Sequence, residues 1–378
     1  MISLVELLAA EPDARRDRAL HLGAAALRAV DGEASTRRVL SQFNLPRRAF
    51  VLSFGKAAES MARAAIAVVP DAWGFVIGAQ RVEVGGLVSL VGGHPVPTPD
   101  AVDTGRAVLA AAKRLGEGDV ALCLVSGGGS AMLELPRLGV KLQDIELLTQ
   151  RAMLCGLPIG ALNRERTRLS QLKGGQLAEA MAPARVVNIV ISDVPGCAPS
   201  VIASGPTWTG SDYAVAADNQ AAQEALVEAG AALGLRLARI EPIVAGEASR
   251  AGASFMRNAA RILAEDEGVD GVVGGGETTV TVLGDGRGGR NGEFVAGAAA
   301  HLGEHLMMSL ATDGLDGTSE GAGALLDAAG LRLGRVMAGP LELAAQQNDT
   351  ARWFRRAGLL LGTGPTGTNV ADLHLVLR

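Results

Sequence analysis

The chain has 378 residues, more than the roughly 250–300 at which a single hydrophobic core stops growing, so two domains are expected. Because 48% of its residues are hydrophobic and 20% are charged, it can bury large cores and is not a disordered chain. A formal net charge of −5 and an aromatic content of only 3% argue against nucleic-acid binding.

The expected compartment is the cytoplasm. The three cysteines, Cys123, Cys155 and Cys197, are an odd number without CxxC spacing, which argues against a disulfide framework and against a cysteine-based zinc site. The N-terminus lacks the basic region of a signal peptide, and no apolar stretch approaches the roughly 18 residues of a membrane span. We therefore expect no membrane partner, and the sequence leaves open whether the chain is a monomer or a homodimer.

Apolar strand-like runs alternate with helical stretches along the whole chain. In the first part we expect strands at 49–53, 74–78, 87–91, 120–125 and 186–191, and helices at 12–30, 57–69, 101–115, 142–155, 165–180 and 214–232. In the second part we expect strands at 242–245, 272–274, 278–283, 305–311, 359–361 and 373–377, and helices at 248–264, 291–302 and mainly throughout 322–357. This alternation predicts two α/β domains with largely parallel sheets, 1–238 and 239–378.

The 50 glycines cluster in loops between these elements, where ligands of open α/β sheets bind. The polar, glycine-rich segments are 54–57, 126–130, 192–207, 284–293, 312–317 and 362–369. Ser126, Gly127, Gly128, Gly129 and Ser130 follow a buried strand and are expected to present backbone N–H groups to an anion; the alternative is a flexible turn.

Lys56 opens a helix directly after a strand, where the helix dipole disfavours a cation. A bound phosphate would compensate for that cost, whereas the alternative is a solvent-exposed lysine. His94 ends a strand and is a candidate for substrate contact or base chemistry, with a capped turn as its alternative.

The segment 284–289 satisfies GxGxxG, the dinucleotide-binding pattern. We expect its preceding strand to be the second arm of a hairpin through Gly276 and Glu277, which argues against that pattern. Arg287 and Arg290 would instead neutralise a transferring phosphoryl group.

Three aspartates also follow strands, and they are candidates for holding Mg²⁺. They are Asp193, Asp313 and Asp316, for which helix capping or turn stabilisation is the alternative.

Taken together, the motifs resemble the glycerate 2-kinase family, which carries DUF4147 and MOFRL domains. The matching segments are SFGKAAESMA (53–62), GGHPVPTPD (92–100), LVSGGGSAMLELP (124–136), LSQLKGGQLA (169–178), SDVPG with IASGPT (192–207), GGGETTVTVLGDGRGGRN (274–291), ATDGLDGT (311–318) and GTGPTGTNVADL (362–373). They occur in order across nearly the whole chain.

The resemblance implies an ATP- and Mg²⁺-dependent kinase that phosphorylates D-glycerate at its 2-hydroxyl. It also implies a Rossmann-like three-layer N-terminal domain, a smaller α/β C-terminal domain and an active site in the cleft between them. Lys56, Arg290 and Arg287 would be catalytic, and Asp193 and Asp313 would hold the metal. The substrate- or nucleotide-binding residues would be Ser126, Gly127, Gly128, Gly129, Ser130, His94, Lys173, Glu277, Asn291, Thr366 and Asn369.

The sequence departs from the family pattern at Cys197, where an acidic residue is usual, and at Gly292, where a glutamine is usual. Two alternative functions therefore stand beside the kinase. One is an NAD(P)-dependent hydroxypyruvate reductase, which the GxGxxG match favours. The other is a catalytically impaired homologue that binds a nucleotide or metabolite. Another small hydroxy acid could also replace D-glycerate as the substrate.

Overall fold

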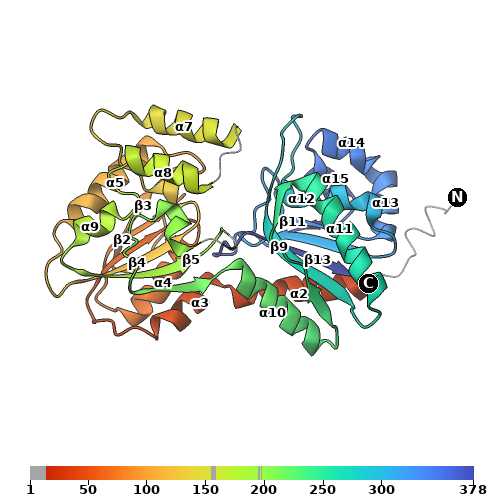
Figure 1. The fold of residues 1–378 in the computed structure, drawn as a ribbon, viewed down its shortest axis with the longest axis horizontal. Helices are drawn as coiled ribbons and strands as arrows, with labels where there is room; N and C mark the ends of the chain where they lie inside the picture. Colours follow the sequence, from red (N-terminus) through yellow and green to blue (C-terminus); the bar gives the residue numbers. More distant parts are fainter. Residues whose placement is uncertain (1–13, 155–158, 195, 197) are drawn as a thin grey trace. The chain divides into compact units, whose positions relative to one another are not determined.

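The chain divides into two compact units, each built around its own sheet (Figure 1). The computed structural model describes residues 14–154, 159–194, 196 and 198–378. We call Val30–Asp218 together with Gly367–Asn369 the parallel-sheet unit. The mixed-sheet unit comprises the residues up to Ala29, Asn219–Thr366 and Val370–Arg378. Both units are α/β structures, as the sequence predicts.

The main division between the two compact units lies at Asp218 and Asn219, and the domain boundary expected at residue 238 stays a prediction. The division precedes helix α10 (Asn219–Ala232), whose first side chain is anchored in the mixed-sheet unit. Asn219 Nδ2 donates hydrogen bonds to the carbonyl oxygens of Val370 and Asp372, at 2.8 and 2.9 Å. The contacts of its first residue therefore place α10 with the second sheet.

The parallel-sheet unit contains six parallel strands in the order β3-β2-β1-β4-β5-β6. The strands are β1 (Phe50–Phe54), β2 (Trp73–Gly78), β3 (Leu87–Val91), β4 (Val120–Ser126), β5 (Arg185–Ile191) and β6 (Tyr213–Ala217). This is the Rossmann strand order, in which the direction of winding reverses between the first and fourth strands. The expectation of a Rossmann-like first domain is therefore confirmed.

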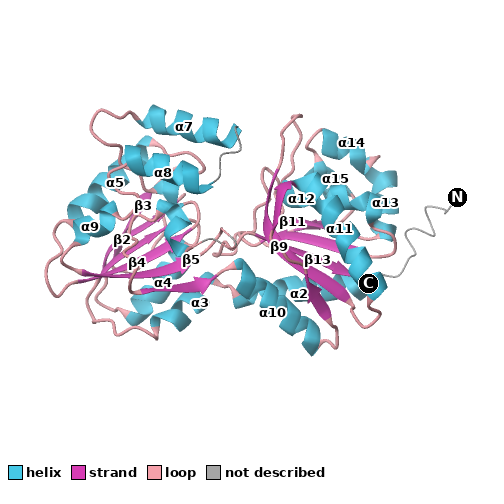
Figure 2. Cartoon of the chain, viewed as in Figure 1, coloured by secondary structure: helices cyan, strands magenta, loops and turns pink. Residues whose placement is uncertain are grey.

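Helices surround this sheet, and Figure 2 shows them separately from the strands. They are α3 (Gly32–Leu40), α4 (Ala58–Val68), α5 (Pro99–Ala112), α6 (Gly129–Met132), α7 (Leu142–Leu154), α8 (Ile159–Leu169), α9 (Gln176–Met181) and the 3-10 helix η1 (Pro199–Ser204). Because both faces are covered, β1 is buried along its whole length and β4 is buried beyond its first residue. The helix expected at 165–180 is two helices, since the chain turns at Gly174 and Gly175 with φ of 64° and 89°.

The mixed-sheet unit contains strands in the order β12-β11-β10-β13-β9-β7, and β8 also pairs with β9. The strands are β7 (Leu237–Arg239), β8 (Val244–Glu247), β9 (Gly271–Thr279), β10 (Leu306–Ala311), β11 (Gly323–Leu326), β12 (Leu360–Leu361) and β13 (Asp372–Leu377). Since β13 is antiparallel to both β9 and β10, those two strands run in the same direction.

Helices α2 (Ala14–Ala29) and α10 lie on one face of this sheet, and α11 (Ala248–Glu265) and α12 (Arg290–Ala298) lie on the other (Figure 1). The remaining helices are η2 (Ala299–His301), α13 (Ala328–Ala338), α14 (Leu341–Gln346) and α15 (Thr350–Arg356). None of the helices in the described residues is long and apolar enough to cross a lipid bilayer.

One strand prediction in this unit is wrong, and one helical segment also contains a strand. The hairpin expected through Gly276 and Glu277 is one continuous strand, β9. Its glycines are required because neighbouring groups approach the backbone: a Cβ on Gly276 would lie 1.9 Å from the Val244 carbonyl oxygen. The segment 322–357, expected to be mainly helical, begins with strand β11, which pairs with β10 and β12.

Candidate active site

The turn that carries Lys56 is hydrogen-bonded to the end of the neighbouring strand. Lys56 N donates to Gly127 O at 2.9 Å, and Ala57 N donates to Ser126 Oγ at 3.0 Å. Ser126 Oγ in turn lies 3.3 Å from Phe54 O. The turn after β1 and the turn after β4 are therefore one rigid assembly at the switch point of the sheet, and the Lys56 side chain is exposed there.

The glycine-rich turn after β4 allows other groups to approach its backbone closely. A Cβ on Gly127 would lie 1.7 Å from Asp193 Oδ2, so the carboxylate rests directly against this glycine. Gly128 has a φ of 82°, and a Cβ there would lie 2.9 Å from His94 Cδ2 and 3.3 Å from Lys56 Cγ. The side chains of Lys56, His94 and Asp193 thus converge on this turn.

The segment 362–369 contributes to both units. Asn369 Nδ2 lies 3.4 Å from Asp193 Oδ2, and Gly367 O accepts a hydrogen bond from Ser60 Oγ at 2.5 Å, both within the parallel-sheet unit. Thr366 belongs to the mixed-sheet unit, where its Oγ1 donates to Thr312 O at 2.5 Å. Asn369 therefore joins the group around Gly127, whereas Thr366 is part of the other unit.

Lys173 supports the glycine-rich turn from inside the protein. Its Nζ lies 2.8 Å from Ser130 O, 3.2 Å from Leu133 O and 3.0 Å from Glu134 Oε2, which accounts for the three hydrogens of an ammonium group. Both side chains of the ion pair are 1% exposed. Burial lowers the pKa of Lys173, while Glu134 opposes that shift. This burial argues against direct contact between Lys173 and a ligand.

Ser130 belongs to a second, partly buried group of polar side chains. Ser130 Oγ lies 2.8 Å from Ser204 Oγ, and Ser204 Oγ donates to Asn163 Oδ1 at 2.9 Å. Because Ser204 donates its hydrogen to the amide oxygen, Ser130 donates to Ser204. Ser204 has a φ of 62°, in the left-handed region that costs a non-glycine residue of order 1–3 kcal/mol.

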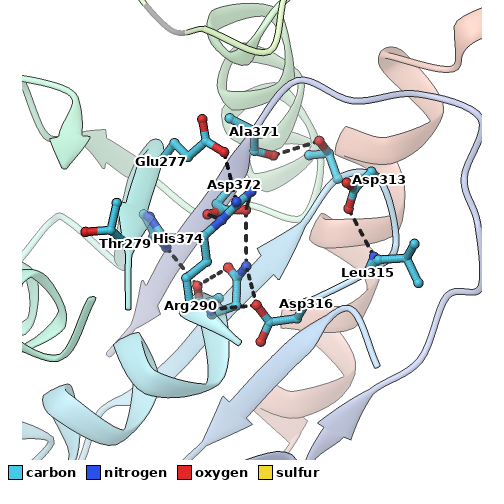
Figure 3. Close-up of polar contacts among 12 residues, drawn as sticks. Glu277, Thr279, Arg290, Asp313, Leu315, Asp316, Ala371, Asp372 and His374 are labelled. Atoms are coloured by element: carbon cyan, nitrogen blue, oxygen red, sulfur yellow. Dashed lines mark hydrogen bonds and ion pairs between the residues drawn. The ribbon is translucent and has the colours of Figure 1, made fainter. Parts of the chain in front are cut away.

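In the mixed-sheet unit, Arg290 lies between two carboxylates (Figure 3). Its Nε and Nη2 donate to Asp372 Oδ2 and Oδ1 at 2.6 and 3.0 Å, and its Nη1 lies 2.8 Å from Glu277 Oε1. Burial alone would lower the pKa of Arg290, but the carboxylates raise it overall. The guanidinium therefore stays charged, and its orientation is fixed.

Asn291 is buried beside this arginine, and its amide group bonds within the protein. Nδ2 lies 3.1 Å from Asp372 Oδ1 and 3.3 Å from Asp316 Oδ1, and Oδ1 accepts from Ser309 Oγ at 2.5 Å. Only 1% of the residue is exposed. Asn291, expected to contact a ligand, therefore has a supporting position, as does Ser126, which is fully buried.

The GxGxxG loop bonds to its own unit through its backbone. Gly286 N donates to Gln347 O at 3.0 Å, Arg287 N to Asp349 Oδ1 at 3.0 Å and Gly288 N to Thr318 Oγ1 at 3.2 Å. These amides therefore cannot cradle a phosphate in this conformation. Arg287 itself is exposed to solvent, as is Asp285 in the same loop.

The N-terminus of α12, which follows this loop, is capped by a carboxylate. Asp316 Oδ1 accepts from Asn291 N, and Asp316 Oδ2 accepts from Gly292 N, both at 2.9 Å. Burial raises the pKa of Asp316, while these backbone hydrogen bonds oppose that shift. A Cβ on Gly292 would lie 2.7 Å from Thr350 Oγ1, so the packing of this chain matches the glycine that replaces the family's glutamine.

The expected metal ligands lie in different units. Asp193 lies against Gly127, whereas Asp313, in the mixed-sheet unit, accepts a hydrogen bond from Leu315 N at 3.0 Å. Within the described residues, no three acidic, histidine or cysteine side chains gather as a metal site. The Asp193 carboxylate beside the glycine-rich turn nevertheless fits Mg²⁺, which protein kinases and ATPases hold through one or two carboxylates plus substrate phosphates.

Sequence reasoning found the residues that converge at the switch point: Lys56, His94, Gly127, Gly128, Asp193 and Asn369. It missed the groups that support Arg290 within the mixed-sheet unit. Asp372 and His374 carried a usable signal, because they are polar residues at alternate positions of an otherwise apolar strand. Cys197 lies outside the described residues, so its departure from the family pattern has no structural outcome.

Two family models match the chain: a domain of unknown function, DUF4147, over residues 18–233, and the MOFRL family over residues 270–372. The sequence is 32% identical to the D-glycerate 2-kinase of Thermotoga maritima, across 97% of this chain and 99% of that protein. It is 33% identical to a putative hydroxypyruvate reductase of Agrobacterium vitis, across 88% and 89% of the two chains. A crystal structure of glycerate kinase from Thermotoga maritima matches with a TM-score of 0.87 and 31% identity, covering 97% of this chain and 100% of that chain.

Proposed function

The chain belongs to the glycerate 2-kinase family, and from this premise we propose that it transfers the γ-phosphoryl group of ATP to the 2-hydroxyl of D-glycerate. The products are 2-phosphoglycerate and ADP. A bond forms between the hydroxyl oxygen and the γ-phosphorus, the bond from that phosphorus to the bridging oxygen breaks, and the hydroxyl proton leaves.

The observation that carries this proposal is the convergence of Lys56, Asp193 and the turn Gly127–Gly129 at the switch point of a Rossmann-ordered sheet. Phosphoryl transfer requires alignment of the two oxygens and neutralisation of charge on the moving group. An exposed lysine, the backbone amides of a glycine-rich turn and one carboxylate at the strand ends provide these elements.

Each of these groups has a role in the proposed reaction. The Lys56 ammonium binds phosphate oxygens, and the amides of the glycine-rich turn donate to the same anion. When bound, Mg²⁺ supplies charge neutralisation between phosphates, and Asp193 is the carboxylate placed to hold it. His94, beside the same turn, is a candidate to accept the hydroxyl proton. Arg290 is proposed to bind an anionic oxygen of glycerate or of the nucleotide.

The reductase alternative agrees less well with the structure. Strands β9 and β10 run in the same direction with α12 between them, so the GxGxxG loop does lie in a strand–helix–strand crossover. However, a dinucleotide pyrophosphate binds at the helix N-terminus, and Asp316 already accepts the amide hydrogens there. The Asp316 side chain would have to move away from these two amides before a nicotinamide cofactor could bind at this helix N-terminus.

The test is a coupled ADP-release assay over a panel of small hydroxy acids, with a parallel assay of NADH oxidation by hydroxypyruvate. We expect ADP release with D-glycerate, and a loss of about 10²–10³ in kcat/KM for Lys56→Ala. Lys113→Ala, an exposed lysine at the end of α5, is the matched control. NADH oxidation without ADP release would establish the reductase, and ATP binding without turnover on any hydroxy acid would establish the impaired homologue.

A further inference from the structure

We propose that Asp372 is the positioning residue for Arg290 in the phosphoryl-transfer reaction, and that Glu277 is the partner which an anionic ligand replaces. The inference rests on the proposed kinase function. In this proposal, Asp372 stays bound to the Arg290 guanidinium throughout the reaction, whereas the contact with Glu277 is exchanged for the ligand.

The two carboxylates differ in burial and in geometry. The Asp372 side chain is 0% exposed and binds Arg290 through both of its oxygens, a bidentate arrangement that fixes direction. The Glu277 side chain is 48% exposed and contacts Arg290 through one oxygen, Oε1, at Nη1. A buried bidentate pair is costly to break, whereas an exposed ion pair through one oxygen exchanges readily with solvent or with another anion.

The orientation of Asp372 is fixed by a chain of hydrogen bonds whose directions can be assigned. Ser309 Oγ lies 2.5 Å from Asn291 Oδ1, which can only accept, so Ser309 donates its hydrogen there. His374 Nδ1, 2.9 Å from the same hydroxyl, must then be the donor. Asn291 Nδ2 donates the next hydrogen bond of the chain, to Asp372 Oδ1 at 3.1 Å. Asp372 thus accepts from both Asn291 and Arg290 (Figure 3).

The protonation of His374 is consistent with this assignment. Burial lowers its pKa to about 3, so the ring is neutral and carries a single hydrogen, which is the one on Nδ1. The ring stacks on Phe294 with centroids 3.9 Å apart.

Strand register places the chain beneath the arginine. Ser309 on β10 is the direct partner of His374 on β13, and Asp372, the first residue of β13, pairs with Gly276 of β9, one residue before Glu277. The four residues of the chain are Ser309, His374, Asp372 and Asn291. The first three lie on strands and Asn291 lies in the first turn of α12, and such elements position a side chain more accurately than a loop does.

A charge count indicates that one carboxylate must give way to an anionic ligand, and the exposure of Glu277 makes it the exchangeable partner. With both carboxylates in contact, the group of three side chains has a net charge of −1 and would repel an anion. Displacement of Glu277 leaves a neutral Arg290–Asp372 pair and exposes Nη1. The ligand is therefore expected to bring an anionic oxygen, from the glycerate carboxylate or from a nucleotide phosphate, to Nη1.

The experiment compares Asp372→Asn, Arg290→Ala and their double variant with Glu277→Gln. Each of the first two should lower kcat/KM by about 10²-fold, and the double variant should be no worse than either, because the residues act as a unit. Millimolar guanidinium should raise the kcat/KM of Arg290→Ala at least about tenfold. It should not raise that of the double variant, because the Asp372 carboxylate forms the binding site for the added guanidinium. Retained activity in Asp372→Asn, or equal rescue of both variants, would overturn the positioning role.

Glu277→Gln should act in the opposite direction. It should lower the KM for one of the two substrates by about two- to fivefold, the effect of removing an exposed competing ion pair, and the substrate affected identifies the source of the anion. Glu342→Gln, which removes another exposed glutamate paired with an arginine, Arg335, should leave both KM values unchanged. If neither KM falls in Glu277→Gln, Glu277 is not the exchangeable partner.

An NMR measurement on the wild-type protein covers the case in which Asp372→Asn does not fold. The Arg290 Nε–H signal, assigned by its loss in Arg290→Lys, should exchange slowly with solvent because it is bonded to Asp372. Glycerate or a nucleotide analogue should shift the Nη signals and leave Nε–H in place. Rapid solvent exchange at Nε would overturn the inference. Absence of ADP release by the wild-type protein would instead refute the proposed function, leaving this measurement valid.

Discussion

Replacing Lys173 by methionine tests the buried support of the glycine-rich turn. Methionine has a comparable length, so the change removes the ammonium group and leaves Glu134 as a buried carboxylate without its cation. The carbonyl oxygens of Ser130 and Leu133 also lose a donor. Breaking a buried ion pair from one side costs about 3–5 kcal/mol, a large share of the 5–15 kcal/mol that stabilises a typical domain.

We expect Lys173→Met to lower the free energy of unfolding by about 3–5 kcal/mol, measured by urea denaturation at pH 7. The double variant Glu134→Gln with Lys173→Met should lose less, because it leaves no uncompensated charge. Lys113→Met, at an exposed position, should change stability by no more than about 0.5 kcal/mol. A loss below about 1 kcal/mol in Lys173→Met would refute the supporting role, as would a double variant whose loss equals the sum of the single losses.

Three further outcomes follow from the packing and the buried titratable groups. Gly127→Ala should reduce kcat/KM at least tenfold, because its Cβ would collide with the Asp193 carboxylate at 1.7 Å, whereas Gly85→Ala, with open space around it, should not. Burial raises the pKa of Glu293 to about 7, so its ionisation destabilises the fold as the pH rises from about 4.5. Glu293→Gln should therefore gain about 1–3 kcal/mol over the wild type between pH 5 and pH 8 in denaturation curves. His374 should remain neutral and protonated at Nδ1 from pH 7 to pH 5 in nitrogen NMR spectra, and a titration near pH 6.5 would contradict the assigned chain.

Most of the parallel-sheet unit was predictable because strands such as β1 and β4 are continuous apolar runs, whereas β6 was missed because residues 214–232 were expected to form one helix. VLSF and VALCLVS read as buried strands, and the glycine-rich segments after them mark the edge where the site lies. The mixed-sheet unit was less predictable. The glycines of GGGETT suggest a turn, yet they stand in β9 because a Cβ on Gly275 would lie 2.0 Å from Asn219 Oδ1. That contact depends on a helix distant in the sequence, so no local pattern reveals it.

The candidate site divides in the same way. Lys56, Asp193 and the turn after β4 could be predicted, since strand ends and glycine spacing are local features. The supporting role of Lys173 could not, because its motif indicates only a turn and its burial arises from packing against Glu134. The expected position of the active site in a cleft between the domains stays a prediction.

Phosphorus NMR of the product formed from D-glycerate, ATP and Mg²⁺ tests the central claim most directly. The account predicts a single new phosphomonoester signal that matches 2-phosphoglycerate, formed by the wild-type protein and reduced about 10²–10³-fold in rate by Lys56→Ala. A signal for 3-phosphoglycerate, or no phosphoryl transfer to D-glycerate at all, would contradict it.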